Sequence, residues 1–175
     1  SDWSSDVCSS DLSMMHAPTP PGIPPLIRLE KITFGYPGRR PILDGLDFQL
    51  HAGERVGLLG PNGSGKTTLF HIVMGLMRPQ TGTIELFGRR VSKEKEFREF
   101  YSKIGLLFQD ADDQLFSPTV LEDVAFGPLN LGKSKEAAED TARKTLSELG
   151  LEGFEDRITH KLSGGEKRLV SLATV

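Results

Sequence analysis

The sequence predicts an α/β fold with a phosphate-binding loop at its centre, and three observations support this prediction. Residues 55–59 form a short apolar run, which is typical of a buried strand. A glycine-rich stretch, residues 60–68, follows this run directly. Apolar side chains then recur with helical spacing, at Leu69, Ile72, Val73 and Leu76. Strand, glycine-rich loop and helix in this order form the context that phosphate binding requires.

Residues 60–68 read Gly-Pro-Asn-Gly-Ser-Gly-Lys-Thr-Thr, which suits direct contact between phosphate oxygens and backbone N–H groups. The helix that begins near Lys66 adds free N–H groups and a positive dipole end. The Lys66 ammonium can reach the β- and γ-phosphates, and the Thr67 hydroxyl can ligate a phosphate-bound magnesium ion. A turn that only joins strand to helix is the alternative, and the flanking elements favour a nucleoside triphosphate site. The candidate binding residues are Gly60, Asn62, Gly63, Ser64, Gly65, Lys66, Thr67 and Thr68.

The composition is ordinary for a soluble globular protein and argues against some partners. The net charge is -3 and no block of Lys and Arg occurs, so we expect no nucleic acid partner. No apolar run approaches the roughly 20 residues of a membrane span, so we expect a peripheral subunit if the protein works at a membrane.

The first 25 residues are interpreted as lying outside the functional domain. Residues 1–12 resemble the translation of a DNA sequencing adapter, so residues 1–13 are interpreted as non-native; a disordered Ser/Asp tail is the alternative. The true start is then Met14 or Met15, and a chain without Cys8 suits a reducing cytoplasm. Residues 14–25 are rich in proline, which favours an extended linker over a ligand for a polyproline reader.

Two strands are predicted before the glycine-rich loop. Residues 26–34 form the first, which ends at a turn over residues 35–38, and residues 42–50 form the second, broken at Asp44 and Gly45. Tyr36 in the turn is the candidate for stacking on an adenine ring. From chemistry alone, a packing role at the surface is the more frequent reading of such a tyrosine.

The middle of the chain delivers a polar side chain to the end of a predicted strand. Residues 83–87 form a strand closed by Gly88, and a helix follows with one apolar face, made by Phe97, Phe100, Tyr101 and Ile104. Residues 104–108 then form a buried-looking strand that places Gln109 at its carboxyl end, where ligands bind in open α/β sheets. The Gln109 amide can coordinate magnesium or orient water.

Three aspartates follow this glutamine, Asp110, Asp112 and Asp113. A calcium loop needs a glycine and a distal glutamate that this stretch lacks, so metal binding by the three is rejected. A polar loop or a contact with a partner protein is expected instead.

The rest of the chain is predicted to be helical. Thr119 with Glu122 and Ser163 with Glu166 both fit the capping box. The first box opens a helix that Gly127 and Pro128 stop, and Ser134 caps a longer helix that Gly150 ends. The apolar face of the longer helix comprises Ala138, Ala142, Thr145, Leu146 and Leu149. Ser163, Gly164 and Gly165 form a second possible anion site, although ordinary helix capping explains them as well.

Together these motifs resemble the ATP-binding-cassette (ABC) ATPases, a type of P-loop NTPase, over residues 26–175. Residues 60–68 match the Walker A loop of the family, Gln109 its Q-loop glutamine and residues 162–168 its signature motif, while Tyr36 lies where the family stacks adenine. Residues 108–110 and 113–128 are similar to the ATPases of energy-coupling-factor importers, which take up cobalt, nickel or vitamins. The resemblance implies a mixed sheet with the nucleotide in residues 26–109, a helical subdomain in residues 110–162 and the signature helix in residues 163–175.

The resemblance also implies cofactors, roles and partners. ATP and magnesium are expected, with Lys66 and Gln109 catalytic and with Thr67 and Gln109 meeting the metal through ATP. A head-to-tail homodimer or heterodimer of ATPase subunits is expected, in which Ser163, Gly164 and Gly165 of one subunit meet the nucleotide of the other. Integral membrane subunits are the expected partners, at the cytoplasmic face of the cell membrane. A non-transport ABC ATPase of DNA repair or translation is the alternative.

One departure from the family pattern concerns catalysis. The Walker B aspartate, the catalytic glutamate and the switch histidine of the family all lie beyond its signature helix, whereas this sequence stops at Val175. We therefore expect a C-terminally truncated fragment that by itself is poorly soluble and does not hydrolyse ATP.

Overall fold

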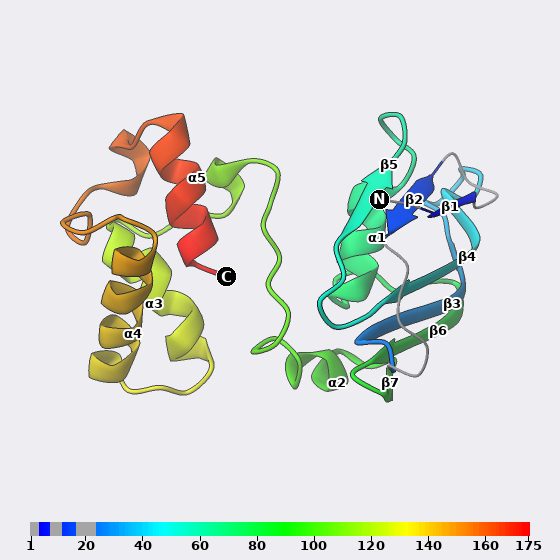
Figure 1. Cartoon of the computed structure of the whole chain (residues 1–175), viewed down its shortest axis with the longest axis horizontal. Helices are drawn as coiled ribbons and strands as arrows, with labels where there is room; N and C mark the ends of the chain where they lie inside the picture. The colour runs from blue at the N-terminus through cyan, green and yellow to red at the C-terminus, as the bar shows by residue number, and fades with distance from the viewer. Residues whose placement is uncertain (1–3, 8–11, 17–23) are drawn as a thin grey trace. The chain divides into compact units, whose positions relative to one another are not determined.

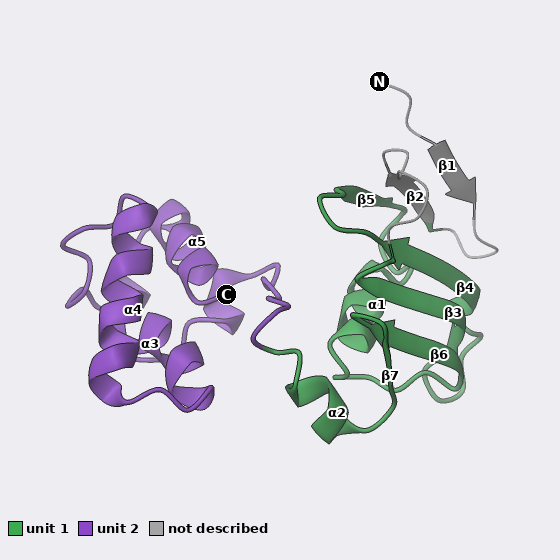
Figure 2. Cartoon of the chain, turned by 60° about the horizontal axis from the view of Figure 1, so that its bottom comes forward, with its two compact units in different colours: residues 1–101 green, residues 102–175 purple. Residues whose placement is uncertain are grey.

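The computed structural model describes residues 4–7, 12–16 and 24–175, which form two compact units, residues 1–101 and residues 102–175 (Figure 2). Trp3, Cys8 and most of the proline-rich leader lie outside the described residues. The interpretation of residues 1–13 as non-native therefore stays a hypothesis. The expected domain limits also stay predictions. The boundary between the two compact units lies between Tyr101 and Ser102 in the sequence.

A four-stranded sheet makes up most of the first unit. Its strands are β3 (Ile27–Phe34), β4 (Leu43–Leu50), β6 (Thr81–Leu86) and β7 (Arg89–Val91). Their order is β4-β3-β6-β7, and each neighbouring pair is antiparallel. Ile27 and Leu29 of β3 and Ile84 and Leu86 of β6 are buried, so alternating residues of these strands provide the core.

Local backbone geometry changes two of the predicted strands. The second predicted strand is not broken, because β4 continues through Asp44 and Gly45. Gly45 accommodates the irregular pairing there with a φ of +65°. The next predicted strand, β6, ends at Leu86, just before the expected Gly88, and the sheet continues beyond this turn. Phe87 and Gly88 have φ values of 50° and 78°, which fit the two-residue turn of a hairpin, and β7 forms its second strand.

The glycine-rich loop lies between β5 (Val56–Leu59) and α1 (Lys66–Val73). Strand β5 pairs with β2 (Ser13–His16), which pairs with β1 (Ser4–Val7), in a second antiparallel sheet. Helix α1 lies beside the four-stranded sheet in both views (Figures 1 and 2). Leu69 and Ile72 are buried, as their spacing predicts, whereas Leu76 lies beyond the helix and is exposed.

The predicted helix over Phe97 and Ile104 is much shorter than expected. Helix α2 covers only Glu94–Arg98. Phe100 then stacks on Phe87 with ring centroids 5.6 Å apart, and this packing takes the chain out of its helical path. The prediction of a strand over residues 104–108 is wrong, because this segment pairs with none of the described strands. A strand needs a hydrogen-bonded neighbour, which apolar composition alone does not supply.

The second unit is helical, as expected. It contains η1 (Ala111–Asp113), α3 (Val120–Asn130), α4 (Lys135–Glu148), η2 (Thr159–Lys161) and α5 (Gly164–Ala173). Helices α3, α4 and α5 pack on one another around a single apolar cluster (purple in Figure 2). Ala138, Ala142 and Leu146 of α4 are buried in this cluster, and the predicted Thr145 and Leu149 are half-buried.

Pro128 does not stop α3, which continues to Asn130. A proline inside a helix removes one N–H donor, a cost that packing can offset. Val120, Val124 and Ala125 hold α3 in the apolar cluster, and the cap then forms where Leu131 N donates to Gly127 O at 3.1 Å. In the part of the chain that the structure describes, helices are too short or too polar to cross a membrane.

Candidate functional site

The loop before α1 leaves its backbone donors available. Gly63 and Gly65 have φ values of +85° and +99°, which fold residues 60–65 into a tight turn ahead of the helix. Gly65 is the N-cap of α1, and none of the described side chains caps this helix start. The first turn also contains no acidic residue. The free N–H groups and the positive dipole end of α1 therefore remain available for an anion.

Gly65 is required by packing as well as by its backbone angle. A Cβ at this position would lie 2.6 Å from Ile42 Cγ2 and 2.8 Å from Leu43 Cδ2, both closer than atoms pack. The loop is thereby pressed against the start of β4, and its curvature is fixed by the core beneath it.

Lys66 folds back over the loop. Its Nζ donates to Gly60 O and to Pro61 O, each at 2.8 Å, and to Ser64 Oγ at 3.4 Å. Ser64 is itself buried, and its N–H donates to Pro61 O at 3.3 Å. The ammonium group thus lies at the loop backbone, where phosphate oxygens are expected.

The two threonines of the motif have different surroundings. Thr67 is exposed in the first turn of α1, whereas Thr68 is buried with its Oγ1 3.4 Å from the Tyr36 hydroxyl. The Tyr36 ring meets Phe34 edge-on, with centroids 5.2 Å apart, and is still 37% exposed. The structure thus brings Tyr36 next to the phosphate-loop helix, while its stacking on adenine stays a prediction.

Gln109 lies in the second unit beside the start of α5. It is exposed and lines a cavity of about 290 Å³. The other residues that line it are Asp110, Ala111, Asp112, Gly164, Lys167 and Arg168. The structure therefore brings Gln109 together with part of the second predicted anion site. The catalytic roles expected for Gln109 and Lys66 stay predictions.

The start of α5 is closed by its own capping box, as the sequence predicts. Ser163 Oγ accepts from Glu166 N at 3.4 Å, and Glu166 Oε2 accepts from Ser163 N and Ser163 Oγ, each at 2.8 Å. Glu166 Oε1 accepts from Arg157 Nη1, also at 2.8 Å. These bonds, first from Ser163 and then from Arg157, lower the pKa of the Glu166 carboxyl to about 2.

Two of the three aspartates, Asp110 and Asp112, make side-chain contacts within the protein. Asp110 Oδ1 accepts from Asp112 N at 3.0 Å and so starts the turn η1. Asp112 forms an ion pair with Lys167 of α5 at 2.5 Å. Among the described residues, no three His, Cys, Asp or Glu side chains converge on a possible metal position. The ion pairs of Arg157 with Glu166 and of Lys167 with Asp112 were not predicted from the sequence, because neither pair is at helical spacing.

Comparison with known families decides what this arrangement is. The sequence profile of ABC transporters matches residues 43–175. The chain belongs to the ABC transporter family. The expected fold, the α/β cassette of ABC ATPases with its helical part, is confirmed, as is the resemblance to the energy-coupling-factor group.

Known ABC proteins resemble most of this chain. A putative ABC transporter ATP-binding protein of Nitratidesulfovibrio vulgaris is 57% identical over 86% of this chain and 56% of its own length. The energy-coupling factor transporter ATP-binding protein EcfA of Methanothermobacter thermautotrophicus is 44% identical over 86% of this chain and 49% of its own. The structure of CbiO1 from Clostridium perfringens, part of the ABC transporter complex CbiONQ, is 30% identical with a TM-score of 0.72, over 86% of this chain and 60% of that one. The chain thus spans about half the length of its curated relatives.

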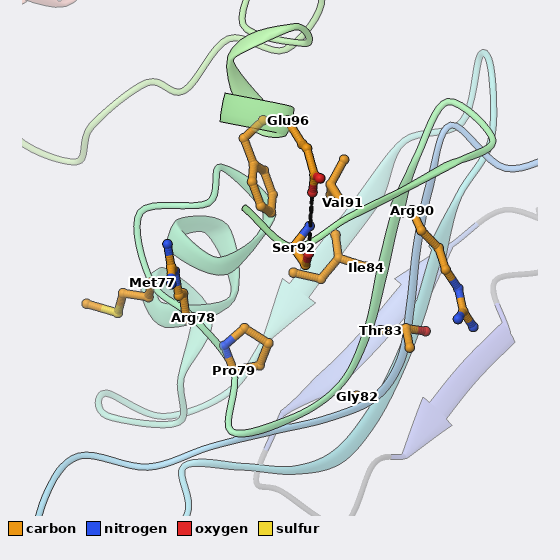
Figure 3. A pocket seen from close by; sticks show the side chains of 11 residues that line it. Met77, Arg78, Pro79, Gly82, Thr83, Ile84, Arg90, Val91, Ser92 and Glu96 are labelled. Carbon is orange, nitrogen blue, oxygen red and sulfur yellow. Dashed lines mark hydrogen bonds between the residues drawn. The ribbon is translucent and has the colours of Figure 1, made fainter. Parts of the chain in front are cut away.

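A second cavity in the ABC chain lies apart from the phosphate loop. It has a volume of about 440 Å³ and is lined by residues that follow α1 and by parts of β6, β7 and α2 (Figure 3). Glu96 accepts from Lys93 N and Ser92 N there, and these bonds lower the pKa of its carboxyl. The phosphate loop precedes α1 in the sequence, whereas the first residues that line this cavity follow α1. The helix between them has eight residues and is about 12 Å long.

Proposed function

We propose that this chain is the nucleotide-binding part of an ATP-hydrolysing subunit that powers an ABC importer of the energy-coupling-factor type. The observation that carries the proposal is the start of α1. Glycine geometry, an uncapped helix start and the ammonium of Lys66 meet there within one loop. This combination suits the phosphates of a nucleoside triphosphate.

The residues of the loop divide the work of holding ATP. Gly60, Gly63 and Gly65 let phosphate oxygens approach backbone N–H groups. Lys66 exchanges its bonds to Gly60 O and Pro61 O for bonds to the β- and γ-phosphates. Asn62 and Ser64 complete the loop around these oxygens, Thr68 offers its backbone N–H, and Tyr36 supports the adenine.

The same loop fits a magnesium ion that arrives with ATP. Thr67 is exposed in the first turn of α1, so its hydroxyl is available as a ligand, whereas Thr68 is committed to Tyr36. Hydroxyl and amide oxygens are ligands that magnesium accepts, which also suits Gln109. When bound, magnesium neutralises charge on the transferred phosphate.

The second anion site makes sense in a pair of ATPase subunits. We expect Ser163, Gly164 and Gly165 of one subunit to meet the nucleotide held by Lys66 of the other, in a homodimer or a heterodimer. Backbone N–H groups at a helix start bind phosphate oxygens with charge-assisted hydrogen bonds, of about 1.5–3 kcal/mol each. ATP then joins the two subunits, and hydrolysis releases them.

The names of the relatives support an importer role. Since EcfA is named a transporter ATP-binding protein and CbiO1 a part of a transporter complex, we expect integral membrane subunits as partners. The protein is then peripheral, at the cytoplasmic face of the membrane. A metal ion or a vitamin is the expected cargo.

Binding of a fluorescent ATP analogue to Lys66→Ala tests the phosphate loop. We expect the affinity for the analogue with magnesium to fall between about tenfold and a hundredfold, because charged hydrogen bonds are lost. Lys144→Ala is the matched control, since Lys144 is an exposed lysine of α4 at 3.9 Å from Glu148, and its affinity should equal that of the wild type. Equal affinity of Lys66→Ala and Lys144→Ala would refute the proposed site.

Co-purification tests the importer role. The full-length protein should be retained by the integral membrane subunit encoded beside it, and ATP turnover should rise when the two are joined in vesicles. Turnover that membrane subunits leave unchanged, together with no retention, would favour a non-transport ATPase.

A further inference from the structure

Gln114 joins two segments that are distant in the sequence. Its Oε1 accepts from the backbone N–H of Phe108 at 3.1 Å, and Phe108 is the residue directly before Gln109. Its Nε2 donates to Ser171 O at 2.9 Å and to Thr174 Oγ1 at 2.6 Å, both near the end of α5. One amide side chain therefore connects the chain before Gln109 with the helix that begins at the signature motif.

A second contact ties the same loop to the other end of α5. Asp112 Oδ1 lies 2.5 Å from Lys167 Nζ, and the Lys167 side chain is 17% exposed. Lys167 belongs to the first turns of α5, whereas Ser171 and Thr174 lie at its end. The loop over residues 108–114 is thus fastened to α5 at two points, one near each end of the helix.

The Gln114 contacts are specific to an amide. Ser171 is 1% exposed, and its carbonyl accepts from Thr174 N at 3.2 Å and from Thr174 Oγ1 at 2.8 Å as well as from Gln114. The side chain of Gln114 supplies a donor to this carbonyl and an acceptor to Phe108 N at once. Neither a carboxylate nor an apolar side chain of similar size offers both groups.

We propose that Gln114 is a positioning residue that makes the Gln109 loop and helix α5 move as one body. This inference rests on the proposed function, because the proposed function supplies the reason why the Gln109 loop and α5 would be connected. Gln109 is expected at the nucleotide of its own subunit, and Ser163 at the nucleotide of the partner. If the loop and α5 are rigidly connected, release of phosphate at the Gln109 contact also changes the position of Ser163 at the nucleotide of the partner subunit.

Hydrogen exchange tests the connection itself. In the full-length protein with isotope-labelled phenylalanine, Gln114→Leu should accelerate exchange of the Phe108 amide by roughly fivefold to tenfold, because its acceptor is lost. Gln49→Leu, at an exposed glutamine of β4, should leave that rate unchanged. Unchanged exchange in Gln114→Leu would overturn the proposal, whatever the enzyme does.

Steady-state kinetics separate positioning from simple stabilisation. Gln114→Leu and Gln114→Glu should lower kcat about tenfold while the KM for ATP stays within about twofold, since the phosphate loop is intact. Gln114→Glu keeps an acceptor for Phe108 N and loses the donor to Ser171 O. A loss of kcat in Gln114→Glu with normal exchange at Phe108 therefore supports the link to α5.

Two further results keep the test decisive. If Gln114→Leu does not fold, Thr174→Val removes one bond of the Gln114 side chain together with the bond from Thr174 Oγ1 to Ser171 O, and it should lower kcat about twofold to fivefold. An unchanged kcat in Thr174→Val and Gln114→Glu would overturn the proposal. A wild-type protein that binds ATP but never hydrolyses it refutes the proposed function instead, and the exchange experiment still decides the role of Gln114.

Discussion

The two helix starts that the sequence marks as anion sites, those of α1 and α5, are built in opposite ways. Helix α1 begins at a glycine, with no side-chain cap among the described residues and no acid in its first turn. Helix α5 begins at Ser163 with a complete capping box, and Glu166 lies in its first turn. Lys66 brings a positive charge to the first site, whereas Glu166 brings a negative charge to the second.

This difference teaches that a helix N-terminus is not a binding site in itself. The start of α1 keeps its donors available and is suited to hold an anion alone. At the start of α5, the Glu166 carboxylate already accepts from the backbone N–H and the hydroxyl of Ser163. An anion there must compete with Glu166, which agrees with a site that works only when a partner subunit delivers the phosphate.

Alanine in place of glycine should separate the two helix starts most strongly. Gly65→Ala should lower the free energy of unfolding by about 2–4 kcal/mol, because the positive φ and the contacts with Ile42 and Leu43 both oppose a Cβ. Gly164→Ala meets no atom within 4 Å and should change it by less than about 1 kcal/mol. Urea denaturation without nucleotide measures both, and equal effects would contradict the comparison.

Acid should weaken the start of α5 and leave the start of α1 unaffected. The pKa of Glu166 lies at about 2 in the folded chain against an ordinary value of 4.5, so its contribution to stability is complete above about pH 4.5. As the pH falls from 4.5 through about 2, the carboxylate is protonated and this contribution is lost. Glu166→Gln should remove this part of the acid dependence.

Thermal unfolding of both proteins between pH 2 and pH 6 measures the effect. The difference in midpoint between wild type and Glu166→Gln should shrink as the pH falls. A constant difference over that range would mean that Glu166 titrates in the same way in the folded and the unfolded chain.

The smallest effect concerns the pair of Arg157 and Glu166. Arg157→Met should raise the pKa of Glu166 only part of the way to 4.5, because the Ser163 hydrogen bonds are the larger cause of its shift. A carboxyl titration followed by nuclear magnetic resonance measures this. A pKa that returns fully to 4.5 would assign the closure of α5 to Arg157 and not to the capping box.

The sequence predicted those parts of the molecule whose chemistry is local. The phosphate loop, the caps at Thr119, Ser134 and Ser163 and the apolar face of α4 depend on residues within a few positions of one another. Spacing is therefore sufficient to find them. Their three-dimensional positions follow the expected elements closely.

The predictions that failed depend on contacts between distant residues. Phe100 lies outside α2, where its ring stacks on that of Phe87. Pro128 lies within α3 because the packing of that helix in the apolar cluster offsets the missing N–H donor. Gln114 gave no sequence signal, since its partners lie 6 and 57 or more residues away. Such contacts are determined by tertiary packing, which cannot be predicted from the periodicity of apolar residues or from secondary-structure propensity.

The position of Lys66 has a consequence for the thermodynamics of nucleotide binding. Because its ammonium is already bound to Gly60 O and Pro61 O, the long side chain has lost much of its rotational freedom before any ligand arrives. Ordering a free lysine costs up to about 2 kcal/mol, and the loop has paid this cost during folding. Calorimetry of ATP binding should therefore find a smaller entropy penalty than a mobile lysine would impose.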